Sequence, residues 1–410
     1  MKFEISELYD LVDVIFLIPF LYLLTQYSFK QLKRKHEFFS VPLMNKLFFY
    51  HIFFGVFYYL YATFNPSDSH KYFTWPQRVG RSWGSFFGTE TTFINFINYP
   101  FINYLGFSYE MMMLLYTWVG FMGFVFAYLF FKENISIDVK VFKKIDFLSL
   151  ILFLPNMHFW TASLGKGALI FFFIMMFSYS ISKPKNRYLG VVISSLFIFY
   201  IRPHIFLLVA VCAIFGFLTG RQKFSWKIKS VVCSFLLLAI FLAKDKILGV
   251  VNLENSQNLV SDFINFTSKR ASSLSESSSG VNMAGYSFPE KMFTFWFRPL
   301  FLDAPGILGI IVSFENLIYL LLFLKIFKRN FVQFIRTAPS NVKMSLVLFL
   351  LTSFAMTFVM SNLGIIIRQK SMIMYFLFFV IYYFLAHEKA ISEKVKLNTL
   401  KVYESFPKAA

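Results

Sequence analysis

Residues 111–131 read MMMLLYTWVGFMGFVFAYLFF and contain no charged side chain. At about 1.5 Å per residue, a helix of this length covers about 30 Å, the thickness of the hydrocarbon core of a bilayer. An uninterrupted apolar segment of this length is typical of a transmembrane helix. This stretch therefore predicts an integral membrane protein.

The composition of the whole chain supports this prediction. Of 410 residues, 57% are apolar, 21% are aromatic and only 15% are charged, whereas soluble domains carry about 25% charged residues. A water-soluble fold cannot bury that much apolar surface. The two cysteines, Cys212 and Cys233, both lie in apolar runs and are expected to be core residues, so we predict neither a disulfide framework nor a thiolate metal site.

Further apolar segments follow the same pattern along the chain. They predict an all-α, polytopic fold of about eleven transmembrane helices (range 10–12). The predicted spans are 11–29, 47–64, 111–131, 146–159, 168–182, 188–201, 205–219, 230–248, 304–324, 344–360 and 371–386.

Basic residues gather in every second connection between these spans. With the N-terminus outside, the inner connections hold 26 of the 40 Lys and Arg residues; they are 30–46, 132–144, 183–187, 220–229, 325–343 and 387–410. Because basic loops remain in the cytoplasm, this pattern places the C-terminus inside, facing the anionic lipids of the inner leaflet. The net charge of +19 does not indicate nucleic-acid binding, since no compact basic domain remains outside the spans.

The chain is expected to form one transmembrane domain, 1–386, followed by a basic cytoplasmic tail, 387–410. Long connections on the predicted outer side cover 65–110 and 249–303, and long connections are often functional. Within the second, the Ser/Gly-rich residues 270–280 predict a mobile lid.

Several predicted spans are too short to cross the bilayer. A 15-residue helix covers about 22 Å, less than the hydrocarbon core of about 30 Å. The outer tips, 155–167 and 202–204, should therefore lie below the outer surface, where a charged group is costly unless it faces a wet cavity or a partner. Lys166, Arg202, His158 and His204 are predicted to line a depression open to the outside.

Other polar residues favour a site on the same side. Arg298 precedes a span, Glu315 lies inside one, and Arg368 and Gln369 precede the last. We interpret Asp68 and Glu315 as candidate catalytic carboxylates. Guanidinium and ammonium groups suit phosphate. The candidate substrate-binding residues are Lys166, Arg202, His204, Arg298, Arg368, Gln369, His158, Trp160, Tyr72, Arg78 and Arg81.

Each of these residues also has a purely structural interpretation. The arginines could extend to lipid headgroups, the histidines could bond backbone carbonyls, Asp68 could form a turn after Pro66, and Glu315 could pair with a neighbouring helix. Trp160, Tyr72 and Trp296 are candidates for stacking on sugars. No spacing typical of a metal site, phosphate loop or hydrolase is present, so no metal or cofactor is predicted.

Five stretches carry a resemblance to a known family. PNMHFWTASLGKGALIFF resembles a segment of bacterial polysaccharide polymerases of the Wzy type and of related membrane glycosyltransferases of the GT-C class. Similar elements are SDSHKYFTW, YIRPHIFLL, FRPLFLDAPGILGIIVSFENLIYLLLF and SNLGIIIRQKSMIM, so the likeness runs from about 65 to 386. Gly167 stands where an Asp commonly follows the Lys of this segment, and the external acidic element lacks the Asp-Glu pair of many GT-C enzymes.

The resemblance implies a function in cell-surface polysaccharide assembly. Such proteins use lipid-linked sugars, usually on undecaprenyl pyrophosphate, at the outer face of the bacterial cytoplasmic membrane. A polymerase that joins lipid-linked glycans is the leading hypothesis. A transferase that moves one sugar from a polyprenyl phosphate, and a flippase or other transporter, are the alternatives. A transporter should carry polar groups through the full depth of the bilayer, whereas here they are predicted on one side.

Overall fold

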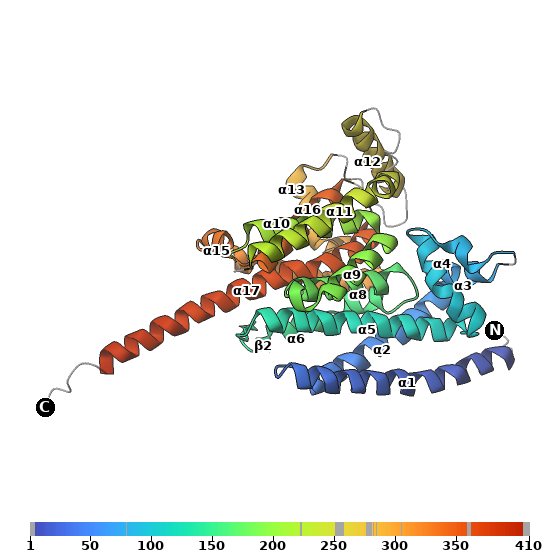
Figure 1. Cartoon of the computed structure of the whole chain (residues 1–410), viewed down its shortest axis with the longest axis horizontal. Coiled ribbons are helices and arrows are strands. Elements are labelled where there is room, and N and C mark those ends of the chain that lie inside the picture. Colours follow the sequence, from blue (N-terminus) through green and yellow to red (C-terminus); the bar gives the residue numbers. More distant parts are fainter. Residues whose placement is uncertain are drawn as a thin grey trace.

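The computed structural model is almost entirely helical (Figure 1). It describes residues 5–404 except 79, 222–223, 251–257, 276–280, 282, 284, 305 and 359–361. Helices account for 82% of the structure. A two-stranded antiparallel hairpin, β1 (Lys140–Val141) and β2 (Ile145–Asp146), pairs Lys140 with Asp146.

The helices follow one another with short connections. The first half holds α1 (Ile5–Lys35), α2 (Val41–Phe64), α3 (Asp68–Thr74), α4 (Thr91–Tyr99), α5 (Tyr109–Asn134), α6 (Phe147–Leu152), α7 (Pro155–Thr161), α8 (Lys166–Ile181) and α9 (Tyr188–Ile201). The second half holds α10 (Pro203–Thr219), α11 (Trp226–Val250), α12 (Leu259–Ser275), α13 (Phe288–Phe297), α14 (Gly306–Phe323), α15 (Phe331–Thr337), α16 (Ser340–Thr357) and α17 (Leu363–Glu404).

Several of these helices are suited to a membrane. Among the described residues, five are long and apolar enough to cross one, or six if the bent pair of α7 and α8 forms one span. The five cover Val41–Phe64, Tyr109–Asn134, Gly306–Ile326, Ser340–Thr357 and Met372–Lys394. The chain is therefore a membrane protein by the length and composition of its helices.

Local sequence explains where these helices begin. The Ser40 and Ser108 hydroxyls accept hydrogen bonds from the backbone N–H groups of Leu43 and Met111, which caps α2 and α5. Proline stands at the first position of α7 and of α10, where its missing N–H costs nothing. α5 lies close against α8 because Gly123 has no side chain: a Cβ there would come within 2.6 Å of the Phe171 ring.

Over the residues that the structure describes, each predicted span except 146–159 lies entirely or mostly within one helix, although α8, α14 and α16 end before the predicted limits. The segment 146–159 is divided between α6 and α7, and α7 then meets α8 at 113°. Of the predicted lid, residues 270–275 form the end of α12, while 276–280 lie outside the described residues. α17 continues through the predicted boundary at 386 as far as Glu404.

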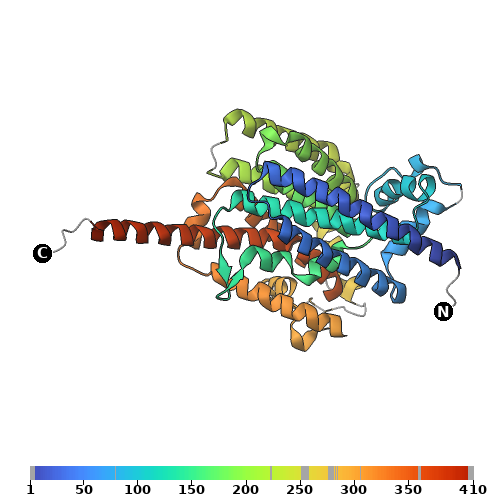
Figure 2. The same cartoon turned by 90° about the horizontal axis from the view of Figure 1, so that it is seen from below.

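The connections separate into two ends of the bundle. Figures 1 and 2 show α3 and α4 at the end where the N-terminus lies, whereas the end of α17 projects from the opposite end. In Figure 1, α12 lies towards the first end, and β2 and α15 lie towards the second. The helices α3, α4 and α12 of the predicted outer loops thus lie apart from β2, α15 and the end of α17, which belong to predicted inner segments.

Candidate functional site

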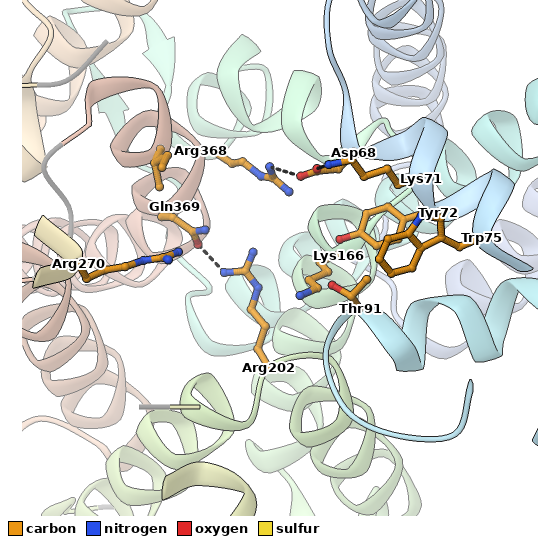
Figure 3. Close-up of a pocket in the computed structure, with 11 residues that line it drawn as sticks. Asp68, Lys71, Tyr72, Trp75, Thr91, Lys166, Arg202, Arg270, Arg368 and Gln369 are labelled. Atoms are coloured by element: carbon orange, nitrogen blue, oxygen red, sulfur yellow. Dashed lines mark hydrogen bonds and ion pairs between the residues drawn. The ribbon is translucent and has the colours of Figure 1, made fainter. Parts of the chain in front are cut away.

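A cavity of about 460 Å³ opens at the end of the bundle that carries α3 and α4. Its lining comes from segments far apart in the sequence (Figure 3). It is lined by Asp68, Lys71, Tyr72, Trp75, Thr91, Lys166, Arg202, Arg270, Ile365, Arg368 and Gln369. Six of these, Asp68, Tyr72, Lys166, Arg202, Arg368 and Gln369, belong to the predicted site.

Positive charge dominates this cavity. Among the described lining residues, five carry a cationic group and only Asp68 carries a carboxylate. α8 begins at Lys166 and α10 begins just after Arg202, so the positive ends of two helix dipoles also lie beside the cavity. Helix N-termini and basic side chains together favour an anion. We name this feature the cationic cavity.

Arg202 is the most buried of these cations. Its residue is only 7% exposed, and one Nη donates to Oε1 of Gln369 at 2.6 Å. Its Nε is buried and has no hydrogen-bond partner among the described residues. A buried donor without a hydrogen-bond partner lowers the free energy of unfolding by about 1–3 kcal/mol. An oxyanion ligand would fit a guanidinium in this state.

Arg368 connects the carboxylate to an aromatic ring. Its Nη1 lies 3.9 Å from Oδ2 of Asp68, and its guanidinium lies over the Trp160 ring, 5.6 Å from the centroid. Asp68 also lies 3.9 Å from the Lys71 ammonium. These distances exceed those of direct hydrogen bonds, and the Asp68 side chain is 56% exposed. The carboxylate thus lies near two cations without a direct hydrogen bond to either, and it is accessible from the cavity.

The break between α7 and α8 brings Lys166 to the cavity. Gly165, at the break, has φ 155°, a conformation that favours glycine. A Cβ on Gly165 would also lie 3.1 Å from the Tyr72 ring. The hydroxyl of Thr117 on α5 donates to the Ala162 carbonyl at 3.0 Å and fixes the turn. The sequence LGKG therefore makes a tight bend that ends at a lysine.

Gly167 is required for a related reason. A Cβ at this position would lie 2.4 Å from the backbone oxygen of Trp160. The turn of this chain therefore has no room for an aspartate next to Lys166. Any carboxylate that acts in the cavity has to come from elsewhere, and Asp68 is the one that lines it.

Tyr72 closes one wall of the cavity. Its side chain is buried and bonds to Thr91 at the start of α4. Burial raises the pKa of Tyr72. The phenol therefore stays neutral at physiological pH and can donate a hydrogen bond to a ligand.

Comparison with protein-family models, with curated proteins and with solved structures finds no match.

His158 and Glu315 lie away from the cationic cavity. The Nδ1 atoms of His158 and His51 lie 2.8 Å apart, and Nε2 of His158 lies 2.7 Å from the Leu152 carbonyl. Glu315 accepts from the backbone N–H of Asn156 at 2.8 Å and from the Tyr319 hydroxyl. His158 thus packs in the core. Glu315 stabilises the start of α7 through its hydrogen bond to Asn156 and does not face Asp68.

The remaining predicted residues also lie outside the lining. Arg298 pairs with Asp303, and the exposed Arg78 and Arg81 lie over the rings of Trp75 and Phe86. His204 follows Arg202 on the far side of Pro203, with a buried Nδ1 that has no partner in the described part of the chain. Trp160 touches the cavity only through Arg368. Trp296 donates to Ser353 at 2.9 Å in the core.

Sequence reasoning missed the other five lining residues, Lys71, Trp75, Thr91, Arg270 and Ile365. Lys71 could have been found, because it lies three residues after Asp68 and shares its helix face. Arg270 had no local signal, since its place depends on how α12 returns over the cavity. Among the described residues, no group of three His, Cys, Asp or Glu side chains is placed to hold a metal ion.

Proposed function

We propose that this chain is a membrane-embedded glycosyltransferase of polysaccharide assembly, of the polymerase type, that acts on glycans linked to a polyprenyl pyrophosphate. The observation that carries the proposal is the cationic cavity, which five cations and one accessible carboxylate line at the end of an apolar helical bundle. A pyrophosphate attached to a lipid is an anion that reaches such a cavity from the membrane. The resemblance of the five sequence stretches points to the same substrate class.

The proposed step is a displacement at the anomeric carbon of the donor sugar. A hydroxyl of the acceptor glycan attacks this carbon, a new C–O bond forms, and the bond to the pyrophosphate oxygen breaks. The leaving pyrophosphate keeps the electron pair, and Asp68 accepts the proton of the hydroxyl. Arg202, Arg368 and Lys166 stabilise the negative charge that develops on the leaving group, the kind of electrostatic contribution that is often the largest in catalysis.

The proposal includes a topology and a location. If α1, α8, α9, α10 and α11 cross the membrane in addition to the five helices named above, the count is ten, and the divided segment 146–159 would bring it to about eleven. The N-terminus would then lie outside and the tail in the cytoplasm of a bacterium. Reporter fusions should then place residues 35, 225 and 395 inside and residues 85 and 275 outside. A cytoplasmic signal at residue 85 or 275 would contradict an outward-facing cavity.

Two other functions would use the same anionic lipid. A single-sugar transferase would add one residue from a polyprenyl phosphate, and a flippase would move the lipid without forming a bond. Product analysis separates the three functions. Loss of a polymerase shortens the chains of the surface polysaccharide, and loss of a single-sugar transferase changes the repeat unit. Loss of a flippase changes neither property of the glycan that has already reached the outer face.

The deciding experiment is complementation of a deletion strain. The deletion should leave single repeat units on the surface, and the wild-type gene should restore long polymer. Lys166→Ala at matched membrane abundance should restore only short chains, whereas Lys328→Ala, an exposed lysine that follows α14, should restore the wild-type length distribution. Long polymer in the deletion strain itself would refute the polymerase proposal.

A further inference from the structure

A second cavity of about 460 Å³ lies between α2, α7, α14 and the start of α17. Its lining is apolar except near its inner end, where Asn156 and Glu315 lie. Phe53 and Phe57 of α2 form one wall, and Leu308 and Val312 of α14 form the other. We name this feature the apolar groove.

The groove opens sideways. Phe57 on one edge is 39% exposed and Leu308 on the other is 42% exposed. α2 and α14 are both helices that can cross a membrane. In a bilayer, the opening between them therefore faces lipid chains instead of water. Its volume is within the range of about 300–1,000 Å³ typical of ligand pockets.

The groove meets the cationic cavity at one residue pair. Trp160 lines the groove, and the guanidinium of Arg368, which lines the cationic cavity, lies 5.6 Å above its ring. The preceding residue, Ile367, lines the groove as well. The apolar groove and the cationic cavity therefore lie next to each other, on either side of this contact between Arg368 and Trp160.

A neighbouring crevice is too small for a second chain. This apolar crevice touches the cationic cavity beneath Arg202 and Gln369, but it holds about 20 Å³, which is close to the space needed by a single water molecule. This crevice cannot hold the second acyl chain of a phospholipid whose first chain lies in the groove.

We propose that the apolar groove binds the phosphate-proximal part of a polyprenyl chain that enters sideways from the membrane between α2 and α14. This inference rests on the proposed function, because it assigns the lipid part of the same substrate. Leu308 and Val312 lie one helical turn apart, and Glu315 ends the groove; from Leu308 to Glu315 a helix rises about 10 Å. The groove therefore holds about 10 Å of chain, and the rest of the polyprenyl remains in the bilayer.

Binding of radiolabelled farnesyl phosphate tests the assignment, with the full-length protein in phosphatidylcholine nanodiscs. Val312→Trp fills the groove and should weaken binding at least tenfold. Ile310→Trp adds the same ring to an exposed part of α14 outside the groove and is the matched control, with an expected change of less than twofold. Inorganic pyrophosphate, which has no chain, should bind both variants as well as it binds the wild type.

Equal farnesyl phosphate affinity in Val312→Trp and Ile310→Trp would overturn the proposal. Displacement of farnesyl phosphate by phosphatidate at equal concentration would also overturn it, since a two-chain lipid would then fit. If Val312→Trp weakened pyrophosphate too, the wild-type measurement described next would decide.

Photolabelling needs no substitution. Farnesyl phosphate with a diazirine on its chain should label wild-type peptides that contain Phe57 or Val312, and labelling confined to other helices would refute the groove. This result is independent of the proposed function. Label in the groove together with normal polymer in the deletion strain would refute the polymerase alone, whereas lost polymer without label would refute the groove alone.

Discussion

The two ends of the bundle pair their charged side chains in different ways. Near the end of α5, Glu133 accepts hydrogen bonds from Arg187 at 2.6 and 2.7 Å and from Lys183 at 2.7 Å. Arg187 also lies over the Tyr179 ring, 3.6 Å from its centroid. In the cationic cavity, by contrast, the carboxylate of Asp68 lies 3.9 Å from each of its two partners.

This contrast distinguishes charged residues that stabilise the fold from charged residues that are available to bind a ligand. At the Glu133 end, both cations donate hydrogen bonds to the same carboxylate, so their charge is partly balanced within the protein. In the cationic cavity the positive charge exceeds the negative charge among the described residues. Such an excess of unpaired charge does not stabilise the folded state. The predictions below test this difference through substitutions at the two ends.

Asp68→Asn should have the largest effect. It keeps the shape of the side chain but removes the proton acceptor, and general-base catalysis is commonly worth about 10²–10⁴-fold. We expect polymer formation to fall about 10³-fold at unchanged membrane abundance, measured as the rate of chain extension in isolated membranes. Asp138→Asn, an exposed aspartate near the β hairpin, is the control and should extend chains at the normal rate. Activity of Asp68→Asn near that of wild type would remove Asp68 from the mechanism.

Arg202→Lys should come next. Lysine keeps the positive charge but loses the planar fork that can bind two oxygens at once. Loss of one such donor to developing charge typically costs about 10²-fold, so Arg202→Lys should be nearly as damaging as Arg202→Ala. Arg336→Lys, on the exposed face of α15, should retain full activity. If Arg202→Lys restored the wild-type chain length, Arg202 would only extend its charge to the lipid headgroups and would not bind the leaving group.

Lys71→Ala should have a small effect. The Lys71 side chain is 67% exposed, so water screens its charge, and contacts of this kind are worth up to about 1 kcal/mol. A two- to fivefold loss of chain extension is expected, and it should shrink as salt is added. An effect as large as that of Arg202→Lys would mean that Lys71 contacts the substrate directly.

Glu133→Gln should leave turnover unchanged and lower stability instead. Removing the acid leaves Arg187, whose side chain is 11% exposed, without its partner, and breaking such a pair costs about 3 kcal/mol. Thermal unfolding in detergent should begin at a lower temperature, while activity per folded molecule stays normal. If Glu133→Gln lost activity at an unchanged unfolding temperature, Glu133 would have a functional role, and the proposed difference between the two ends would be wrong.

The sequence was sufficient to predict most helices and part of the cavity. Apolar length alone located the helices, because a membrane requires long apolar segments. Lys166, Arg202 and Arg368 were found because each lies at or near the start of a helix on the same side of the bundle. The division of 146–159 into α6 and α7 was not predicted, although Pro155 was a signal for it.

Other features depend on contacts that no local pattern contains. His158 was expected beside the substrate, but its neighbour is His51, 107 residues away. Glu315 was expected to be catalytic, and its bond to the backbone of Asn156 spans 159 residues. The apolar groove likewise needs α2 and α14 side by side, which helix length and charge do not specify.

The way α7 is held has a consequence for how the protein is made. The turn after α7 bonds to Thr117 of α5, which leaves the ribosome earlier, but the start of α7 bonds to Glu315 and to the carbonyl of Ile367. Ribosomes add about 5–20 residues per second. Because Glu315 lies 159 residues after Asn156, it is synthesised roughly 10 to 30 s after the start of α7. During biogenesis the bent hairpin is thus anchored at one end only, and the cavity becomes complete when the last membrane helix is inserted.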